Sequence, residues 1–393
     1  MKHKISFAAA VVAAAALGAG GVLAATGTGL KVTPSAANAQ TATVSQVTCS
    51  GSSADSATLS GAISALPEGG TLVIEGTCDL TQPLVLAAGR TYEGSTGDGS
   101  NDGVGTVLDQ HFTGSYLVAN DAYANKQASA GTGDPLTVQD LAIACDSSAT
   151  NGLVLMAWQV IVSHVDVTGC DSGIVDTNTD AAGTAIPATG TSVNSRFDDN
   201  FIQNSASHGF WVDDSGNAVT DGFFDDDQVA SSGQNAVELD NAAGWNVTGN
   251  HLYNDTQDGI YASRMWGTTI SDNYIEDFGD KQSSGSWFGI FGANQCGIGS
   301  TIDDNMIFND GGEGTSASYT YLGVSQNSSD CAGLLTVNGN VIYDQTAGNK
   351  ATGMDFQGNG SSASLVIGSA GNVIRGVATT RTTSGSDVSI GGE

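Results

Sequence analysis

The sequence has few basic residues and few prolines, and beyond its N-terminal segment it has no long hydrophobic run. Only 11 of the 393 residues are Lys or Arg, against 41 that are Asp or Glu, and the formal net charge is −30. So acidic a surface repels phosphate and anionic lipid, which excludes nucleic acid and anionic membranes as partners. No segment after residue 39 approaches the about 20 apolar residues that a membrane span requires.

The N-terminal segment predicts export. It begins Met1-Lys2-His3-Lys4, becomes apolar and alanine-rich from Ile5 to about Ala25, and contains the small-x-small site Ala37-Asn38-Ala39. We interpret residues 1–39 as a secretory signal peptide. The alternative is a retained membrane anchor, which the glycines at positions 18, 20 and 21 disfavour. Residues 40–48 are predicted to be a flexible leader, and the mature protein is predicted to be secreted and extracellular.

Cysteine usage agrees with an oxidising compartment. Six cysteines in an exported chain predict disulfides, and none of them has the CxxC spacing of a zinc site, so no metal site is predicted. Cys145 and Cys170 occupy the same place in consecutive repeats, where stacked strands lie about 4.8 Å apart, within disulfide reach. The predicted pairs are Cys49–Cys78, Cys145–Cys170 and Cys296–Cys331.

A short pattern recurs four times between residues 208 and 294. Each copy is a strand-like segment whose side chains alternate, and the copies start 27, 23 and 30 residues apart. The copies are His208–Asp213, Asn235–Asp240, Asp258–Ser263 and Phe288–Ala293. A repeat of about 20–30 residues with one or two strands cannot bury its own apolar face, so it must stack on its neighbours as a solenoid.

Alternation sorts the side chains of these copies onto two faces. The set predicted to line the interior is Phe210, Val237, Ile260 and Ile290, backed by Val212, Leu239 and Ala262. The set predicted to form a column on the outer wall is Trp211, Glu238, Tyr261 and Phe291. We call these four residues the outer column and predict that it is the functional site.

Two further features define the solenoid. A helix over residues 53–66, ended by Pro-Glu-Gly-Gly, would cover the open edge of the first coil within an N-terminal cap of residues 49–90. Gly-Asn or Asp-Asn pairs also recur before apolar residues, as a tight turn into the next strand requires. The repeated asparagines, predicted to be structural, are Asn200, Asn250, Asn273, Asn305, Asn340 and Asn372.

The capping helix, the segment Pro-Glu-Gly-Gly-Thr-Leu-Val-Ile and the Asn-centred repeats resemble the right-handed parallel β-helices of the pectin-lyase-like group. The resemblance covers about residues 50–385. It implies an all-β, single-domain β-helix over residues 49–393, with about ten coils. It leaves function open, because this architecture carries lyases, hydrolases, epimerases and binding proteins.

The outer column suits a sugar. Aromatic rings beside carboxylates match the CH-rich faces and hydroxyl rims of sugars, and glycosidic chemistry commonly needs two carboxyl groups. We predict that Glu238, flanked by rings, is the acid/base. Trp211, Tyr261 and Phe291 would form a sugar platform. The predicted polar contacts are Asp213, Asp240 and Arg264.

The second carboxylate is assigned by a resemblance. The segment Asp227-Gln-Val-Ala-Ser-Ser-Gly-Gln-Asn-Ala-Val-Glu238-Leu resembles the active-site coil of inulin fructotransferases, which implies that Asp227 and Glu238 are a catalytic pair acting on a fructan. A register shift of one residue would select Asp226. The 23-residue spacing from Asp227 to Asn250 equals that from Asn250 to Asn273, which makes Asp227 the turn residue of its coil in an alternative interpretation.

Other interpretations stay open. Asn178-Thr-Asp180, Asp198-Asp199 and His208-Gly209 resemble elements of polygalacturonases, but the spacing of the histidine differs. A pectate or uronate lyase would use calcium, with ligands such as Asp225 to Asp227, and Arg264 or Lys281 as base. A non-catalytic β-helix would bind glycans through the same rings. We predict a polysaccharide or oligosaccharide as partner, a monomer or homotrimer, and no cofactor unless the protein is a lyase.

Overall fold

The computed structural model of the chain describes residues 43–95, 105–187, 191–310, 316–327, 331–345, 351–360 and 364–392. The predicted signal peptide lies outside the described residues. The first described strand, β1 (Val44–Thr48), pairs in parallel with β2 (Thr71–Glu75). These residues therefore belong to the first coil, and the leader predicted over residues 40–48 does not extend past residue 43.

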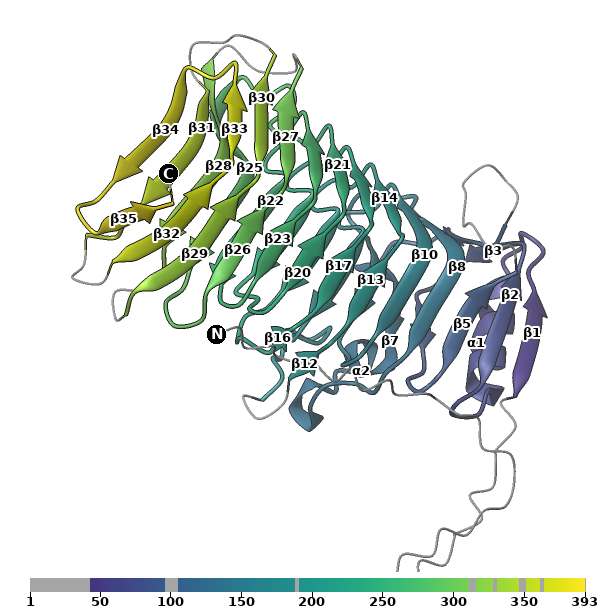
Figure 1. Cartoon of the computed structure of the whole chain (residues 1–393). Helices are drawn as coiled ribbons and strands as arrows, with labels where there is room; N and C mark the ends of the chain where they lie inside the picture. Colours follow the sequence, from purple (N-terminus) through teal and green to yellow (C-terminus); the bar gives the residue numbers. More distant parts are fainter. Residues whose placement is uncertain are drawn as a thin grey trace, which may run out of the picture. The chain divides into compact units, whose positions relative to one another are not determined.

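The strands form a right-handed parallel β-helix with three faces, and Figure 1 shows it from the side, with the coils stacked from β1 to the C-terminal end. Face 1 consists of β1, β2, β5 (Thr91–Gly94), the first half of β8 (Thr137–Ala144), the first half of β10 (Ile161–Thr168), β13 (Arg196–Asp198), β17 (Phe223–Asp225), β20 (Asn246–Thr248), β23 (Thr269–Ser271), β26 (Ser300–Asp303), β29 (Gly333–Asn338), β32 (Leu365–Ala370) and β35 (Val388–Gly391).

Face 2 follows face 1 along the chain, after a turn of two residues in coils such as those of β17 and β20 and within the single strands β8 and β10. It consists of β3 (Thr77–Leu80), β6 (Val107–Gln110), the second halves of β8 and β10, β14 (Phe201–Gln203), β18 (Gln228–Ala230), β21 (His251–Tyr253), β24 (Tyr274–Glu276), β27 (Met306–Asn309), β30 (Val341–Asp344) and β33 (Val373–Arg375).

Face 3 is a separate parallel sheet that carries the four repeated segments. It consists of β4 (Leu84–Leu86), β7 (Tyr116–Asn120), β9 (Asn151–Leu155), β11 (Ile174–Thr177), β15 (Phe210–Asp213), β19 (Val237–Asp240), β22 (Ile260–Met265), β25 (Ser284–Asn294), β28 (Ser316–Gln326), β31 (Thr352–Gln357) and β34 (Thr379–Ser384). The short strands β12 (Ser192–Val193) and β16 (Val219–Thr220) pair beside it.

The predicted capping helix is present as α1 (Asp55–Ala65). Leu59 and Ile63, one turn apart, and Leu66 just after the helix are all buried against the first coils. Pro67 and the glycines that follow stop the helix, because proline disfavours a helical conformation of the residue before it. A second short helix, α2 (Asp121–Ala124), and a 3-10 turn (Ala128–Ala130) lie in the segment between β7 and β8.

The interior of the solenoid is built from the predicted set. Phe210, Val237, Ile260 and Ile290 are neighbours in register and have no exposed surface. A column of identical positions stacks in this way because parallel strands place equivalent residues side by side, so each coil closes the apolar face of the next.

The repeated asparagines form a hydrogen-bonded ladder at the turn between faces 1 and 2. Asn250 shows the pattern: its amide donates to Asn273 Oδ1 at 2.9 Å and to the Phe224 carbonyl at 3.0 Å. Its backbone N–H donates to the same Asn273 oxygen at 3.1 Å. The ladder satisfies backbone groups that are buried in the turns, as each coil must do. The structural role predicted for the asparagines is confirmed.

All three predicted disulfides are present. Cys49–Cys78, Cys145–Cys170 and Cys296–Cys331 each link adjacent coils, with Cα–Cα distances of 4.9, 5.0 and 5.3 Å. They fit an extracellular or periplasmic location, where disulfides persist. Among the described residues, no helix is long and apolar enough to cross a membrane.

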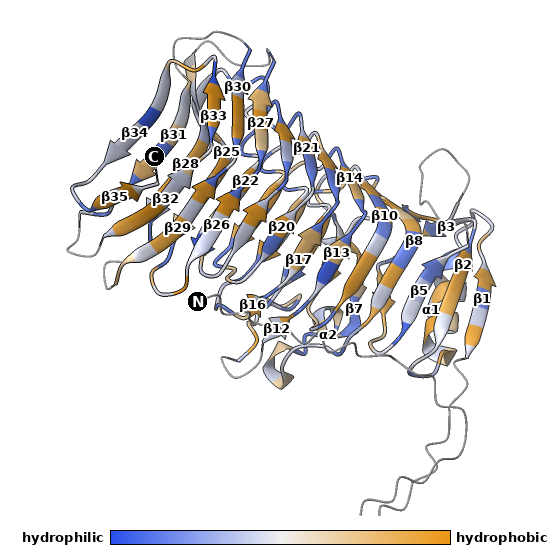
Figure 2. Ribbon diagram, viewed as in Figure 1, coloured by the Kyte–Doolittle hydropathy of each residue, from blue (hydrophilic) through white to orange (hydrophobic). Residues whose placement is uncertain are grey.

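The last coils expose apolar side chains on face 2. Met306, Val341 and Val373 are 47%, 37% and 59% exposed, and Figure 2 shows β30 and β33 mostly in the hydrophobic colour. Whether the protein is a monomer or a homotrimer stays a prediction.

Candidate active site

The outer column forms in the predicted register on face 3. Trp211 of β15 is paired with Glu238 of β19, which is paired with Tyr261 of β22, which is paired with Phe291 of β25. The three rings are half-buried, whereas Glu238 is only 7% exposed. The structure therefore places one carboxyl group between aromatic neighbours on the wall of the solenoid.

Burial and neighbouring charge both act on Glu238. Burial raises the pKa of Glu238 to about 8, and the Asp240 carboxylate adds to this effect. The amide of Asn235 donates a hydrogen bond to Glu238 Oε2, and the backbone N–H of Asp258 donates to Asn235 Oδ1 at 2.9 Å. Glu238 is consequently protonated near neutral pH and held in a fixed orientation, as a general acid requires.

Two further carboxyl groups lie beside Glu238. Asp240, two positions along the same strand, accepts a hydrogen bond from Trp211 Nε1 at 3.2 Å. Asp213 is paired with Asp240 in register and accepts from the Thr177 hydroxyl at 3.2 Å. Burial raises the pKa of Asp213 as well. The sequence identified both aspartates as polar contacts, but the structure makes Asp240 the carboxyl neighbour of Glu238.

A second row of polar side chains supports the column. It consists of the residues that begin three of the repeated segments, His208, Asn235 and Asp258. His208 Nδ1 lies 4.0 Å from Glu238 Oε2, and its ring centroid lies 5.4 Å from that of Trp211. Burial lowers the pKa of His208 to about 4, so the imidazole is neutral near pH 7. Burial raises the pKa of Asp258 to about 7.

Sequence reasoning did not assign this row to the site. The sequence does contain a signal for this row, because each of its three residues is the first residue of its repeated segment. A column at that place of the repeat is as regular as the outer column itself. The row also links the coils, because the backbone N–H of Asp258 donates to Asn235 Oδ1 at 2.9 Å and that of Phe288 donates to Asp258 Oδ1 at 2.7 Å.

The aromatic platform extends toward the C-terminal coils. The rings of Tyr261 and Phe291 are stacked with centroids 5.1 Å apart, and the Phe288 ring lies 4.9 Å from that of Phe291. Gly323 of β28 continues the column, and a Cβ added there would lie 2.6 Å from the Phe288 ring. The absence of a side chain at Gly323 lets Phe288 lie across the next coil.

Aromatic side chains close the opposite end of the column. Tyr116 and Tyr123 pack with Trp211 around a small apolar cluster of Ala119, Val154 and Val175. Val175 precedes Trp211 in the register of face 3. The outer wall thus changes at Trp211 from covered apolar residues to the polar and aromatic set.

The predicted partner Asp227 does not join this site. Its side chain is 1% exposed and is a member of the asparagine ladder, where its Oδ1 accepts from the backbone and the amide of Asn200 at 2.7 and 2.8 Å. Its backbone N–H donates to Asn250 Oδ1 at 2.9 Å. The alternative interpretation of Asp227 as a turn residue is confirmed, and the pairing implied by the resemblance to inulin fructotransferases is not formed.

Asp225 and Asp226 do not supply the second carboxyl group of the candidate site either. Asp226 is exposed in the same turn with a positive φ of 59°, between faces 1 and 2. Asp225 accepts hydrogen bonds from Thr248 at 2.6 Å and Arg196 at 3.0 Å on face 1. With Asp227 turned into the ladder, these three aspartates do not form the calcium site that a lyase would need.

Arg264 lies at the end of β22, at the edge of face 3. Its guanidinium donates to Gln295 and, at 3.5 Å, to Asn241, which directly follow the neighbouring strands β25 and β19. Burial lowers the pKa of Arg264. Lys281 is 86% exposed and pairs with Asp280 at 2.6 Å.

Comparisons with known proteins agree on architecture. A family model described as "Periplasmic copper-binding protein (NosD)" matches residues 146–328, which is less than half of the chain. Among curated proteins, none matches the chain.

Solved structures similar to the chain include two enzymes and a tailspike. The catalytic unit of a thermostable GH87 α-1,3-glucanase from Streptomyces thermodiastaticus shares 14% identity, with 92% of this chain and 70% of that one covered and a TM-score of 0.49. An alginate lyase from Paenibacillus sp. shares 11% identity, with 87% and 98% covered and a TM-score of 0.48. The Dettilon tailspike protein shares 14% identity, with 84% and 68% covered and a TM-score of 0.48.

Likenesses of this strength carry no argument about activity. The fold rests instead on the parallel register of the strands of this chain, coil by coil. On that register the fold of the chain is a right-handed parallel β-helix.

Proposed function

We propose that the protein cleaves or transfers glycosidic bonds of an extracellular polysaccharide, with Glu238 as general acid. The observation that carries the proposal is a buried carboxyl group on the outer wall, with a pKa of about 8, between Trp211 and Tyr261. Structural carboxyl groups rarely combine burial, a fixed orientation and flanking rings, and such perturbed groups cluster at functional sites.

The chemistry follows from the protonation states. Glu238 would donate its proton to the glycosidic oxygen as the bond to the anomeric carbon breaks, leaving a neutral hydroxyl on the departing sugar. Asp240 or Asp213, in place of Asp227, would activate the attacking hydroxyl or stabilise the positive charge that develops on the sugar. Tyr261 and Phe291 would stack against the sugar face. None of these steps requires a cofactor.

The charge of the wall favours a neutral sugar. Asp213 and Asp240 are paired in register beside the protonated Glu238, and Arg264 is the single cation among the predicted site residues. A uronate carboxylate would be repelled at such a surface unless a cation lay between.

A uronate lyase is the second candidate, and Arg264 is the observation that favours it. Burial lowers the pKa of this guanidinium, which is the direction that a proton-abstracting base needs. Such an enzyme would need calcium or another cation to neutralise the substrate. A glycan-binding protein without activity would use the same rings.

The test is a screen of the purified chain against fructans, neutral glucans, arabinans, pectins and alginate, with products identified by mass. Hydrolysis adds water, elimination leaves an unsaturated uronate, and intramolecular transfer leaves the total mass unchanged. On the substrate found, Glu238→Gln should lower kcat by about 10²–10⁴-fold while binding persists.

Glu276→Gln on face 2 is the matched control, since Glu276 lies on another face and pairs with His251 at 3.7 Å. Full turnover by Glu238→Gln would refute the role of Glu238. Binding without any turnover by the wild type would establish the glycan-binding alternative instead.

A further inference from the structure

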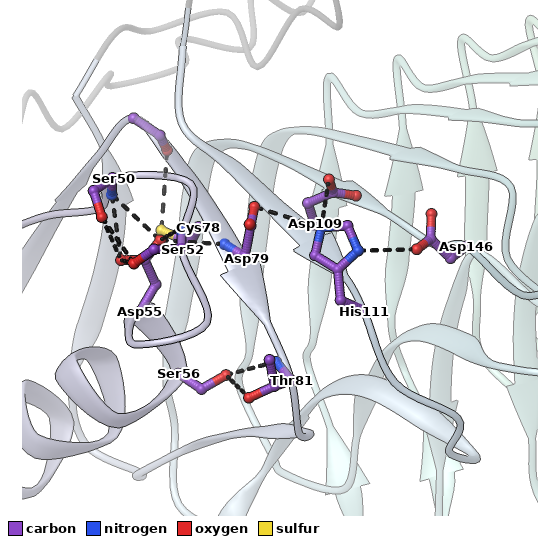
Figure 3. A network of polar contacts seen from close by, with 11 residues as sticks. Ser50, Ser52, Asp55, Ser56, Cys78, Asp79, Thr81, Asp109, His111 and Asp146 are labelled. Carbon is purple, nitrogen blue, oxygen red and sulfur yellow. Dashed lines mark hydrogen bonds and ion pairs between the residues drawn. The ribbon is translucent and has the colours of Figure 1, made fainter.

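Four titratable side chains converge at the N-terminal end of face 2, on a different face from the candidate active site (Figure 3). His111 follows β6 and lies between Asp79 of β3, Asp109 of β6 and Asp146, which follows β8. Nε2 of the imidazole lies 3.4 Å from Asp79 Oδ1 and 3.3 Å from Asp109 Oδ2. Nδ1 lies 3.2 Å from Asp146 Oδ2.

The orientation of the ring is informative because both nitrogens face carboxylate oxygens. A neutral imidazole has one N–H donor and one lone pair. If Nδ1 donates to Asp146, the lone pair of Nε2 points at the oxygens of Asp79 and Asp109, which repel it. A proton on Nε2 or a metal ion between Nε2 and these two oxygens would each remove the repulsion, but only a metal ion would bond to all three atoms.

The spacing fits a metal ion better than it fits direct hydrogen bonds. An N–H···O bond has a usual length of about 2.9–3.0 Å, shorter than both Nε2 distances. Ligands at about 2.0–2.1 Å from a tetrahedral ion are separated by about 3.3 Å, which follows from the tetrahedral angle. The measured separations of Nε2 from Asp79 and Asp109 are 3.4 and 3.3 Å.

Asp146 has the role that a carboxylate plays beside a metal-binding histidine. A histidine that binds a metal through one nitrogen usually donates the other N–H to a carboxylate, which fixes the tautomer and raises the basicity of the ligand. Asp146, at 3.2 Å from Nδ1, is placed for this.

The disulfides and the cap hold the carboxylates in place. Asp79 follows Cys78, and Asp146 follows Cys145, so each lies next to a disulfide that links two coils. The backbone N–H of Asp79 also donates to the Asp55 carboxylate at the start of α1. The backbone at Asp79 and at Asp146 is therefore held in place before any ion binds, which lowers the entropic cost of binding.

We propose that His111, Asp79 and Asp109 bind a divalent first-row transition ion such as Zn²⁺ or Mn²⁺, with Asp146 orienting the imidazole and water completing the coordination. One imidazole with carboxylates is a donor set that suits these ions. None of these ligands is a cysteine, so the absence of CxxC spacing does not bear on this site. The ion would link the coils of β3 and β6 and so stabilise the N-terminal cap, independently of any activity on face 3.

The experiment is calorimetric titration of Zn²⁺ and Mn²⁺ into the tag-free, EDTA-treated protein, with thermal unfolding as a second readout. We expect one ion per chain and a rise in Tm. His111→Gln should weaken Zn²⁺ binding by about tenfold or more and remove the Tm rise, and Asp146→Asn should weaken binding less.

His164→Gln is the matched control. His164 also lies between two aspartates, Asp140 and Asp199, but both separations are 3.6 Å and the side chain is 51% exposed. This variant should bind Zn²⁺ like the wild type. Equal Zn²⁺ affinity of wild type and His111→Gln, or Ca²⁺ binding as tight as Zn²⁺ in both, would show an acidic surface without an imidazole site and overturn the proposal.

Discussion

Replacing Glu238 by glutamine should stabilise the folded protein at high pH and leave it unchanged at low pH. The pKa of Glu238 is raised from 4.5 to about 8 in the folded state, mainly by burial. The unfolded chain therefore ionises first as pH rises, and folding loses stability between these two pKa values. Below pH 4.5 both states are protonated, so this group contributes no pH dependence there.

The size of the effect follows from the shift. One pKa unit corresponds to about 1.4 kcal/mol, so a shift from 4.5 to about 8 costs the folded state about 5 kcal/mol above pH 8. Glu238 is 7% exposed, and solvent screens it little. The glutamine carbonyl can still accept from Asn235. The variant should regain about 3–5 kcal/mol at pH 8.5, with part of the gain offset by imperfect amide contacts.

Urea unfolding followed by tryptophan fluorescence at several pH values between 4 and 9 would measure the effect. Other buried acids titrate in wild type and variant alike, so the difference between the two curves isolates Glu238. Glu93→Gln, in β5 on face 1, is the control for the loss of a glutamate outside the site. A curve for Glu238→Gln parallel to that of the wild type would show that the carboxyl group of Glu238 is not desolvated, and the argument for its role as an acid would fail.

Three further predictions concern the site and the ladder. Asp227→Asn should raise the urea midpoint at pH 7 and leave activity unchanged. Burial raises the pKa of Asp227 well above its usual value, and an asparagine amide at this position could donate to the Phe197 carbonyl, as the Asn250 amide donates to the Phe224 carbonyl one coil further on. Asp226→Asn in the same turn is the control and should change neither the midpoint nor the activity. Gly323→Ala should raise KM with little change in kcat, since its Cβ would displace the Phe288 ring, whereas Gly368→Ala, with no atom within 3.8 Å, should have no effect. The kcat of the wild type should fall as pH rises through about 8, where Glu238 loses its proton, and a flat profile to pH 10 would contradict its role as an acid.

The sequence alone determined much of the fold. The four repeated segments, their alternation and the stacked asparagines each follow from local rules, and parallel stacking leaves one register in which Phe210, Val237 and Ile260 are all buried. The disulfide pairs follow from the same stacking. Because the outer column depends only on this register, its four residues could also be predicted.

Only the tertiary structure decided the chemistry of the wall and the role of Asp227. Sequence spacing gave Asp227 two interpretations, and the choice depended on whether its side chain joined Asn200 and Asn250 in the ladder. The desolvation of Glu238, its contact with Asp240 and the convergence of Asp79 and His111 depend on distances between coils. Periodicity specifies which residues are neighbours, but side-chain packing specifies which polar atoms meet and how much water they lose.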